Sequence, residues 1–517
     1  MSAEAAASSE PLRPSTVTPT ALSALIATVD GIRGAERPGN DILISGITHD
    51  SEAVRPGDMF AALPGAHKHG IEFAAAAAER GALAVLTDVE SVPTAERSGL
   101  AVVSAADPRE VLGPLASRVY GTPSEQLLLI GVTGTNGKTT STYFIEAGLR
   151  AAGHTTGLIG TVETRVGDRA LPSRHTTPEA TDLQALFAVM REDGVDAAAM
   201  EVSSHALALR RIDGTSFTVA VFTNLSQDHL DFHRDIEDYY AAKAKLFTSS
   251  FTDVAVVNID DRYGARLAGE AEIRLVTVSP SGRPADWRVG EVDAGTTGSE
   301  FVLHADDGTP LRARTQLPGA FNVANAALSI AALVTAGVAP SDAVNGIAAC
   351  AHVPGRMQRV NAGQPFTAVV DYAHTPEAVK QLIATLRPVT TGRLIVVLGC
   401  GGDRDSAKRP LMGAAAVTGS DVAVFTSDNP RSEDPVEIIR AMEAGARGVA
   451  NAHRAAVHVE PDRRSAIRLA VSLARAGDVV VVAGKGHERV QETGGVRTPF
   501  DDVDEVTGAI RATVRAS

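Results

Sequence analysis

A glycine-rich stretch, GVTGTNGKTT at residues 131–140, has the residue types of a phosphate-binding loop. Glycines let backbone N–H groups turn toward an anion, and a helix beginning near Thr139 adds the positive end of its dipole. Lys138 can reach the β- and γ-phosphates of a nucleotide, and the Thr139 hydroxyl can bind Mg²⁺. The spacing is unusual, because Val132 holds the place of the first glycine in the common P-loop pattern.

The sequence on either side of this loop favours a nucleotide site over the alternative, a plain glycine-rich turn before a helix. The apolar run QLLLIGV at 126–132 is typical of a strand buried on both faces. The segment TTSTYFIEAGLRAAG at 139–153 is typical of a helix. A mononucleotide loop needs this order of strand, loop and helix. The shifted glycines argue against an ordinary GTPase or ATPase motor.

Apolar strands that end in polar loops recur along the chain. Three follow the glycine loop, at 195–205, 217–229 and 253–261, and four more lie between 366 and 488. Alternating strands and helices predict parallel sheets with ligands outside the carboxyl ends of the strands.

Proline and glycine breaks at Gly121, Pro123, Pro354 and Gly355 divide the chain into three parts. The predicted fold class is α/β with three domains: a small α/β domain at 1–124, a central parallel-sheet domain of P-loop type at 125–353, and a Rossmann-like domain at 354–517.

Composition narrows the class of protein. The chain has 517 residues and a net charge of −14, which disfavours a general nucleic-acid binder. Its two cysteines, Cys350 and Cys400, provide no disulfide framework, as in a reducing cytosol. The N-terminal segment lacks the pattern of a signal peptide, and no apolar run is long enough to span a bilayer. We expect a cytoplasmic protein without membrane insertion, acting as a monomer.

Seven motifs follow one another in the chain: TGTNGKTT, HTTPE, MEVSSHAL, NLSQDHLDFH, PGAFNVANAALS, PGRMQ and DYAHTP. Together they closely resemble the Mur ligase family, over most of the chain from about residue 45 onward. The phosphate loop of that family has the same shifted glycines. The resemblance implies an ATP-dependent ligase that forms an amide bond in peptidoglycan precursor synthesis, through an acyl phosphate. The motifs DNPRSEDP and GKGHE imply UDP-MurNAc-L-Ala-D-Glu and meso-diaminopimelate as its substrates.

The resemblance also implies which residues bind ATP and Mg²⁺. Glu201 and His229 each end a strand-loop of the central region, where either alone would be an ordinary solvated loop residue. In the family pattern both are Mg²⁺ ligands, together with Thr139 and Lys243, and the catalytic residues are Lys138, Lys243 and His229. The implied ATP-binding residues are Gly134, Thr135, Asn136, Gly137, Lys138, Thr139, Thr140, Asn322, Asn325, Arg356 and Asp371, with His374 close by. The alternative for Asn322 is a helix N-cap.

Lys243 lies in DIEDYYAAKAKLF, a predicted helix. Ile236, Tyr240, Lys243 and Phe247 are spaced to share one face, whereas Lys245 lies off that face. The alternative is a lysine whose stem is buried and whose amine reaches solvent. The resemblance implies an N6-carboxylated lysine instead, because a buried amine with a depressed pKa reacts with CO₂ and the product is an anionic Mg²⁺ ligand.

Residues for the sugar nucleotide are implied by the resemblance alone. Those for the uridine diphosphate are Ser51, His67, Lys68 and His69, and those for the muramoyl dipeptide are Thr176, Thr177, Ser203 and Arg211. The chain departs from the family at Leu209, where a glutamine is often found two residues before that arginine.

The implied residues for diaminopimelate are Arg404, Asp428, Asn429, Pro430, Arg431, Gly484 and Glu488. Their chemistry suits a second zwitterionic centre, since Arg431 can pair with a carboxylate and Glu488 with an ammonium group. DNPR also has the residues of a turn after a strand. L-Lysine or another diamino acid stays an alternative substrate. A folylpolyglutamate synthetase and a nucleotide-dependent switch or binding module are more distant alternatives.

Overall fold

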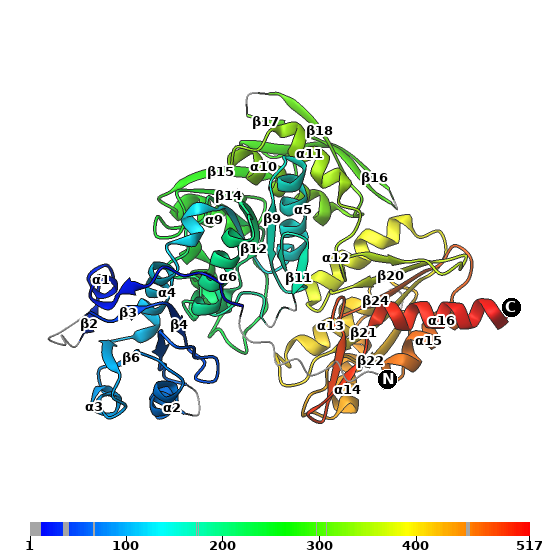
Figure 1. The fold of residues 1–517 in the computed structure, drawn as a ribbon. Coiled ribbons are helices and arrows are strands. Elements are labelled where there is room, and N and C mark those ends of the chain that lie inside the picture. The colour runs from blue at the N-terminus through cyan, green and yellow to red at the C-terminus, as the bar shows by residue number, and fades with distance from the viewer. Residues whose placement is uncertain are drawn as a thin grey trace.

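The computed structural model describes residues 12–34, 41–65, 68–171, 173, 175–295, 297–306, 308–450 and 455–516. Three main sheets, each with helices packed against it, follow one another along the chain (Figure 1). We call the parts of the chain that form them the first, central and third units. The predicted α/β class with largely parallel sheets is confirmed.

The first unit is built on a five-stranded sheet with the order β2-β7-β6-β5-β4. Strands β4 to β7 are parallel, and β2 is antiparallel to its neighbour. The strands are β2 (Ile32–Gly34), β4 (Gly46–Thr48), β5 (Asp58–Ala61), β6 (Ala84–Asp88) and β7 (Ala101–Ala105), and the helices are α1 (Leu22–Ala27), α2 (Ala74–Glu79), α3 (Val92–Glu96) and α4 (Pro108–Val119). A short pair, β1 (Thr20–Ala21) and β3 (Leu43–Ile44), lies beside it.

The central unit holds an eleven-stranded sheet whose parallel core runs β9-β12-β8-β13-β14-β15. These strands are β8 (Leu128–Thr133), β9 (Thr156–Ile159), β12 (Ala197–Glu201), β13 (Val219–Phe222), β14 (Val254–Asn258) and β15 (Arg274–Ser279). The sheet is extended at one end by β10 (Thr164–Val166) and β11 (Arg169–Leu171), and at the other by β16 (Trp287–Gly295), β17 (Gly298–Ala305) and β18 (Pro310–Thr315). Strand β8, which leads into the glycine loop, lies between β12 and β13.

Helices cover both faces of this sheet. The helices α5 (Lys138–Ala151), α10 (Ala320–Thr335) and α11 (Pro340–Ala349) share one apolar core with Ile130 and Val132 of β8. The opposite core contains Leu129 and side chains of α6 (Ala180–Glu192), α7 (Ser204–Ala208), α8 (Ile236–Ala244) and α9 (Arg262–Glu270). Burial on both faces explains why β8 is a continuous apolar run.

The third unit has a six-stranded sheet with the order β19-β20-β24-β21-β22-β23, parallel except for β19. Its strands are β19 (Gln358–Val360), β20 (Thr367–Asp371), β21 (Leu394–Cys400), β22 (Val422–Ser427), β23 (Ala456–Val459) and β24 (Val479–Ala483). Its helices are α12 (Pro376–Leu386), α13 (Lys408–Val417), α14 (Pro435–Arg447), α15 (Arg463–Leu473) and α16 (Asp502–Ala516). A hairpin of β25 (Val490–Thr493) and β26 (Val496–Pro499) follows the GKGHE segment.

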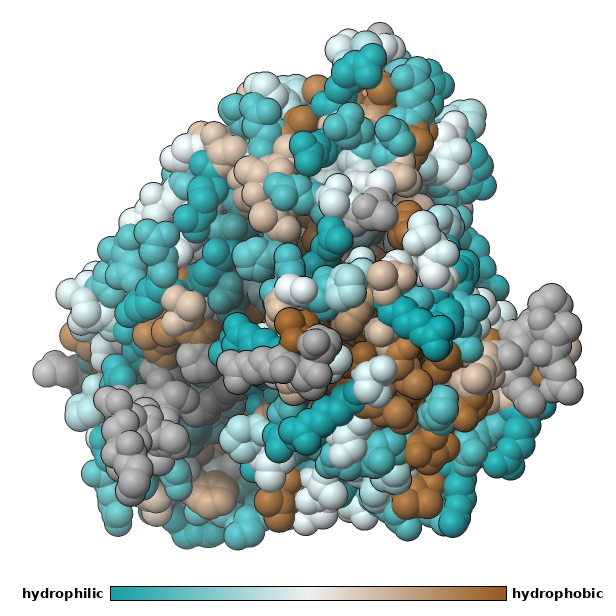
Figure 2. Space-filling model, turned by 90° about the vertical axis from the view of Figure 1, so that its right-hand side faces the viewer, coloured by the Kyte–Doolittle hydropathy of each residue, from teal (hydrophilic) through white to brown (hydrophobic). Residues whose placement is uncertain are grey.

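The surface on the side of the third unit mixes hydrophilic residues with smaller groups of hydrophobic ones (Figure 2). Large hydrophobic side chains exposed on this unit include Val459, Val496 and Val514. Among the helices in the described parts of the chain, none combines the length and the apolar character needed to cross a bilayer.

Helix α5, which follows the glycine loop, packs against α11 with no room for an added methyl group. A Cβ at Gly346 would lie 2.4 Å from the carbonyl oxygen of Ala147 and 2.5 Å from the Cα of Gly148. We expect Gly346→Ala to lower the free energy of unfolding by about 1–3 kcal/mol, because the two backbones must separate. Urea unfolding measures this.

The matched control is Gly269→Ala in α9, where an added Cβ meets nothing within 4 Å. Alanine is the better helix former, so this variant should be as stable as the wild type or up to about 1 kcal/mol more stable. Equal stability of the Gly346→Ala variant and the control would contradict the tight packing of α5 on α11.

Candidate active site

A cleft of about 450 Å³ lies between the central and third units, at the carboxyl ends of β8, β12 and β13. Fifteen residues predicted for the nucleotide, the metal or the muramoyl dipeptide line it: Thr135, Asn136, Gly137, Lys138, Thr139, Thr140, Thr176, Glu201, Ser203, Arg211, His229, Lys243, Asn325, Arg356 and Asp371. Arg404 and His374 line it too. The structure therefore brings together residues from two units that were predicted from separate motifs.

The glycine loop has a conformation that requires glycine at two positions. Gly134 has φ 149° and Gly137 has φ 92°. A Cβ at Gly134 would lie 1.9 Å from the Thr223 hydroxyl oxygen. That hydroxyl donates to the carbonyl of Asn136, at 2.6 Å, and the N–H of Asn136 donates to Asn224, at 3.0 Å. The loop after β13 thus holds the glycine loop in place before any ligand binds.

Two polar side chains at the start of α5 contact opposite walls of the cleft. The Lys138 ammonium donates to the carbonyls of Gly134 and Thr135, at 2.8 and 2.9 Å, and burial lowers its pKa. The Thr139 hydroxyl donates to Glu201 at 3.0 Å and accepts from Arg356 of the third unit at 2.9 Å. Arg356 therefore reaches the phosphate loop across the cleft.

Glu201 is a buried carboxylate that accepts several hydrogen bonds. Besides Thr139, it accepts from the N–H of Thr161 at 2.8 Å and from the Thr161 hydroxyl at 3.0 Å. Within the described residues, no group of three or more His, Cys, Asp or Glu side chains is arranged to hold a metal. The oxygen donors of Glu201 and Thr139 suit Mg²⁺, which binds proteins through one or two carboxylates and takes its other ligands from phosphates and water.

Lys243 is 1% exposed on the inner face of α8, so the prediction of a buried lysine is confirmed and an amine in solvent is wrong. Its amine donates to the carbonyl of Gly134 at 2.9 Å and lies 4.7 Å from the centre of the Tyr239 ring. The Lys138 ammonium donates to the same carbonyl. Burial, together with the charge of Lys138, lowers the pKa of Lys243 well below its ordinary value. The neutral amine is therefore favoured.

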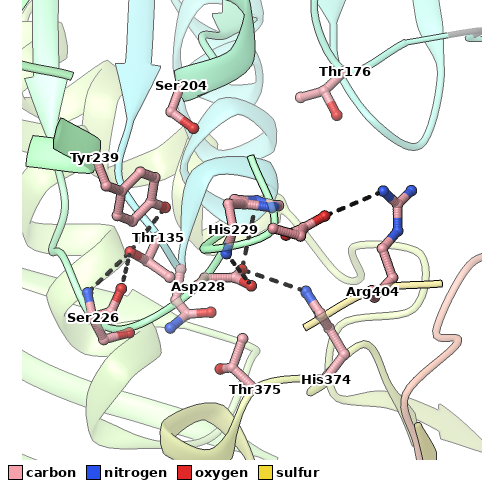
Figure 3. A network of polar contacts seen from close by, with 12 residues as sticks. Thr135, Thr176, Ser204, Ser226, Asp228, His229, Tyr239, His374, Thr375 and Arg404 are labelled. Carbon is pink, nitrogen blue, oxygen red and sulfur yellow. Dashed lines mark hydrogen bonds and ion pairs between the residues drawn. The ribbon is translucent and has the colours of Figure 1, made fainter. Parts of the chain in front are cut away.

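An acid–base cluster of Asp228, His229 and His374 connects the two units (Figure 3). The Asp228 carboxylate lies 3.5 Å from His229 and 3.7 Å from His374 of the third unit. Burial alone would raise the pKa of Asp228, but the hydrogen bond from His374 and the nearby charge of Lys408 hold it below its usual range. Burial lowers the pKa of His229 to about 3, so its imidazole is neutral and can bind a metal. His229 has φ 56°, a costly conformation of the kind found at functional sites.

Arg356 and Asp371 are held at the carboxyl end of β20. The Arg356 guanidinium lies 4.3 Å from the centre of the Tyr372 ring. Both oxygens of Asp371 accept backbone N–H groups, from Met357 at 2.7 Å and from Ala373 at 2.8 Å. Burial raises the pKa of Asp371.

A second cavity, of about 240 Å³, adjoins the cleft and shares His229, Asp228, His374 and Arg404 with it. The predicted diaminopimelate residues Arg404, Asp428, Asn429, Arg431, Gly484 and Glu488 line it, whereas Pro430 does not. Arg404 lies 3.5 Å from Asp231 of the central unit. The two motifs DNPR and GKGHE therefore meet at one cavity, next to the phosphate loop.

The DNPR segment is a turn that presents Arg431. Arg431 has φ 52°, and its guanidinium donates to the carbonyl of Gly402 at 2.6 Å. A Cβ at Gly402 would lie 1.9 Å from the carbonyl of Pro430, so glycine is needed for the turn to approach β21. The N–H of Glu433 donates to Pro430 at 3.0 Å and closes the turn.

Three of the four residues predicted for the muramoyl dipeptide line the cleft: Thr176, Ser203 and Arg211. Thr177 is 1% exposed and does not line it, since its hydroxyl donates to the carbonyl of Glu201 at 2.9 Å. Arg211 is ion-paired with Glu179 at 2.8 Å.

Of the residues predicted for the uridine diphosphate, Ser51, Lys68 and His69 lie in the first unit and line neither cavity. His69 lies 2.6 Å from Asp88, while Ser51 and Lys68 are half-buried and exposed, respectively. His67 lies outside the described residues.

Asn322 is not a helix N-cap. Helix α10 begins at Ala320 with Gly319 as its cap, and the Asn322 side chain donates to the carbonyl of Pro318 at 2.8 Å. Asn322 is 1% exposed and does not line the cleft, whereas Asn325 does. The cap is three residues earlier than this alternative would place it, and glycine at 319 has no side chain to mark it in the sequence.

Several residues of the site were missed by the sequence analysis. They are Thr161, Asp228, Tyr372 and Lys485. Asp228 and Tyr372 each adjoin a predicted residue, so their places at the carboxyl ends of strands were a usable signal. Thr161 lies in a loop after β9 that has no distinctive pattern, and Lys485 is recognisable only from its contacts.

Sequence models of three domains match the chain: the catalytic domain of the Mur ligase family at 43–120, the Mur ligase middle domain at 132–333, and the Mur ligase glutamate ligase domain at 355–486. The chain belongs to the Mur ligase family. The resemblance seen in the motifs is thus confirmed over most of the sequence.

The similar members of the family include named enzymes. The UDP-N-acetylmuramoyl-L-alanyl-D-glutamate–2,6-diaminopimelate ligase of Streptomyces avermitilis is 54% identical over 504 residues, covering 97% of this chain and 99% of the relative. The ligase of the same name from Corynebacterium efficiens is 48% identical and covers 92% of each chain. A solved structure of a ligase of this name has a TM-score of 0.68 and 34% identity, and covers 96% of this chain and 100% of its own.

Proposed function

We propose that this Mur ligase joins meso-diaminopimelate to the D-glutamate of UDP-MurNAc-L-Ala-D-Glu at the expense of ATP, in peptidoglycan precursor synthesis. One observation carries the proposal. The cavity lined by Arg431, Asn429 and Glu488 adjoins the cleft lined by the phosphate loop, and both share His229 and Arg404. An amine bound in the cavity would therefore face a carboxylate activated in the cleft.

The proposed reaction has two steps. The D-glutamate side-chain carboxylate attacks the γ-phosphorus of ATP, giving an acyl phosphate and ADP. The diaminopimelate amine then attacks the acyl carbon, and the tetrahedral intermediate collapses with loss of phosphate and a proton. Lys138 would stabilise the charge on the transferred phosphoryl group, and Arg356 would fix the phosphates from the other side of the cleft.

In this proposal each unit binds a different part of the substrates. Residues 1–124 bind the uridine diphosphate, with Ser51, Lys68 and His69 as contacts and His67 among the expected ones. Residues 125–353 bind ATP and the muramoyl dipeptide, through the phosphate loop, Asn325, Thr176, Ser203 and Arg211. Residues 354–517 bind diaminopimelate and close over the nucleotide.

Mg²⁺ would be held by Glu201 and Thr139, with His229 and a carboxylated Lys243 nearby, and would neutralise phosphate charge. Carboxylation of Lys243 would convert its neutral amine and CO₂ into a carbamate and a proton. The contacts favour this reaction: as an ammonium, Lys243 shares the Gly134 carbonyl with the Lys138 ammonium. Two ammonium groups at one carbonyl repel each other, whereas an anionic carbamate at Lys243 would attract the Lys138 ammonium.

The choice of diaminopimelate over L-lysine rests on Arg431. Diaminopimelate carries a second carboxylate that a guanidinium can pair with, and L-lysine would leave Arg431 without that partner in the cavity. The similar named relatives from Streptomyces avermitilis and Corynebacterium efficiens carry diaminopimelate in their names. A nucleotide-dependent switch would not explain why Arg431, Asn429 and Glu488 line a second cavity beside the phosphate loop.

The proposed function predicts that phosphate release requires ATP, UDP-MurNAc-L-Ala-D-Glu and diaminopimelate together. Lys138→Ala should lower this release by about a thousandfold or more, because the charge on the phosphoryl group loses its cation, while circular dichroism shows an intact fold. A coupled phosphate assay with a panel of diamino acids makes the measurement. Release without an amine would indicate a switch or simple ATPase, and normal turnover by folded Lys138→Ala would remove the nucleotide assignment.

Carboxylation predicts chemical rescue. Lys243→Ala should be about 10²-fold or more less active, and acetate should restore part of the activity by supplying an anion in the vacated space. The control is Lys245→Ala two residues on, whose side chain is exposed and whose loss should leave activity unchanged, with no response to acetate. An active Lys243→Ala variant that ignores acetate would contradict the carbamate.

Arg431→Ala should strongly raise the KM for diaminopimelate and leave the KM for ATP nearly unchanged. The lost paired hydrogen bond corresponds to roughly 2–5 kcal/mol of discrimination against L-lysine. Arg431→Lys should restore only part of it, because an ammonium lacks the two-pronged geometry. The ratio of kcat/KM for the two amino acids measures this, with the exposed Arg440→Ala of α14 as the control. A ratio that does not move in Arg431→Ala, or a wild type that prefers L-lysine, would contradict the substrate assignment.

A further inference from the structure

Lys485, in the GKGHE segment, is a lysine with no exposed side-chain surface. Its ammonium donates three hydrogen bonds: to the Asn429 side-chain oxygen at 3.1 Å, to Glu488 Oε2 at 2.9 Å and to the carbonyl of Val490 at 2.8 Å. An ammonium has three protons to donate, so its donors are all used. The three acceptors belong to the DNPR turn, the GKGHE segment and the β25–β26 hairpin.

Two of these acceptors line the cavity proposed for diaminopimelate. The Asn429 side-chain oxygen accepts from both Lys485 and the N–H of Glu492, at 3.0 Å. The opposite orientation of the amide would turn its NH₂ group toward both donors, so the ammonium and the Glu492 N–H together fix which end of the amide is the donor. That NH₂ group then donates to Glu488 Oε2 at 2.8 Å.

Two groups bond to the Glu488 carboxylate through the same oxygen, Oε2. Lys485 and Asn429 both bond to Oε2, so neither occupies Oε1, and the residue lines the cavity with 32% of its side chain exposed. The Lys485 ammonium is also the counter-ion of this carboxylate. Glu488 is thereby held in one orientation toward the cavity.

The hairpin extends the same network to the DNPR turn. The N–H of Arg431 donates to the carbonyl of Glu492 at 3.0 Å, and the N–H of Gly494 donates to the carbonyl of Arg431 at 2.6 Å. The Gln491 side chain donates to the carbonyl of Asp428 at 2.8 Å. The segment that presents Arg431 is thus bound to the hairpin, whose first residue, Val490, accepts from Lys485.

We propose that Lys485 is a positioning residue for the amino-acid substrate: from beneath the cavity it orients Glu488 and Asn429 and ties the DNPR turn to the β25–β26 hairpin. The inference rests on the proposed function, because it takes the cavity to be the diaminopimelate site. Lys485 itself does not line the cavity and acts through the residues that do.

A merely structural ion pair is the competing explanation. Removing a buried ammonium leaves its buried acceptors without a partner, and this destabilises the fold wherever the group lies. A positioning role makes a narrower claim: its loss weakens amino-acid binding through Glu488 and leaves ATP binding and the chemical steps unchanged. Steady-state kinetics with each substrate varied in turn separates the two.

The test is Lys485→Met, which keeps the length of the side chain and removes its charge and donors. We expect the KM for diaminopimelate to rise at least about tenfold, with kcat and the KM for ATP within about twofold of wild type. A double-mutant cycle adds the decisive comparison. In a Glu488→Gln background, Lys485→Met should raise the KM for diaminopimelate by less than about threefold, because the group it positions is already gone.

The control for lost stability is Val480→Ala, at a fully buried apolar position on β24, the strand that leads into GKGHE. It should lower the thermal midpoint without changing the KM for diaminopimelate relative to that for ATP. If Lys485→Met does not fold, Lys485→Gln takes its place. Glutamine keeps two of the three donors, so the expected rise in KM is smaller and again confined to diaminopimelate.

An unchanged KM for diaminopimelate in a folded Lys485 variant would overturn the role of Lys485 while the ligase assignment stands. Equal fold-changes in the wild-type and Glu488→Gln backgrounds, or an equal rise for ATP, would likewise show a structural role only. A wild-type enzyme that releases no phosphate with diaminopimelate would contradict the proposed substrate, and this role with it, before any variant is made.

Discussion

A hydrogen bond from Arg356 to the Thr139 hydroxyl joins residues 217 positions apart and brings the third unit to the first turn of α5. The rest of the site depends on this contact, because the two parallel sheets can form a site only where their carboxyl ends face one another. Parallel strands end at a common edge, so each sheet brings its polar loops together. The cleft and the adjoining cavity lie between those two edges.

Charges at this interface are used in two ways. In the central unit Lys138 and Lys243 both donate to one backbone carbonyl, and burial lowers the pKa of both. Such a surface favours phosphate or another anion. In the third unit the buried cations Lys485 and Arg463 bond to protein groups around them, Arg463 to both oxygens of Asp502 and to the carbonyls that end β22 and β24. Those cations fix loops and leave ligand binding to Arg431 and Glu488.

Much of the fold was predictable because its signals are local. Continuous apolar runs indicated strands buried on both faces, and glycines at 134 and 137 indicated a loop whose backbone only glycine allows. The spacing around Lys243 indicated a buried face of α8, since helical periodicity is a local property. The alternative of Asn322 as a helix N-cap was wrong, because Gly319 caps α10 and leaves Asn322 inside it. A cap is decided by backbone dihedral angles, and a glycine cap has no side chain to announce it.

The sequence by itself determined the α/β class, the order of the polar loops and which side chains are chemically able to bind phosphate, metal or a zwitterion. Tertiary structure decided which of them meet. The contact of Arg356 with Thr139, the approach of His374 to Asp228 and the bonds of Lys485 to Asn429 each join separate segments. Such contacts depend on strand order and on how the sheets face one another, and neither has a local signature. Residue type and periodicity are local properties of the sequence, whereas the distances between remote side chains are determined only when the sheets pack.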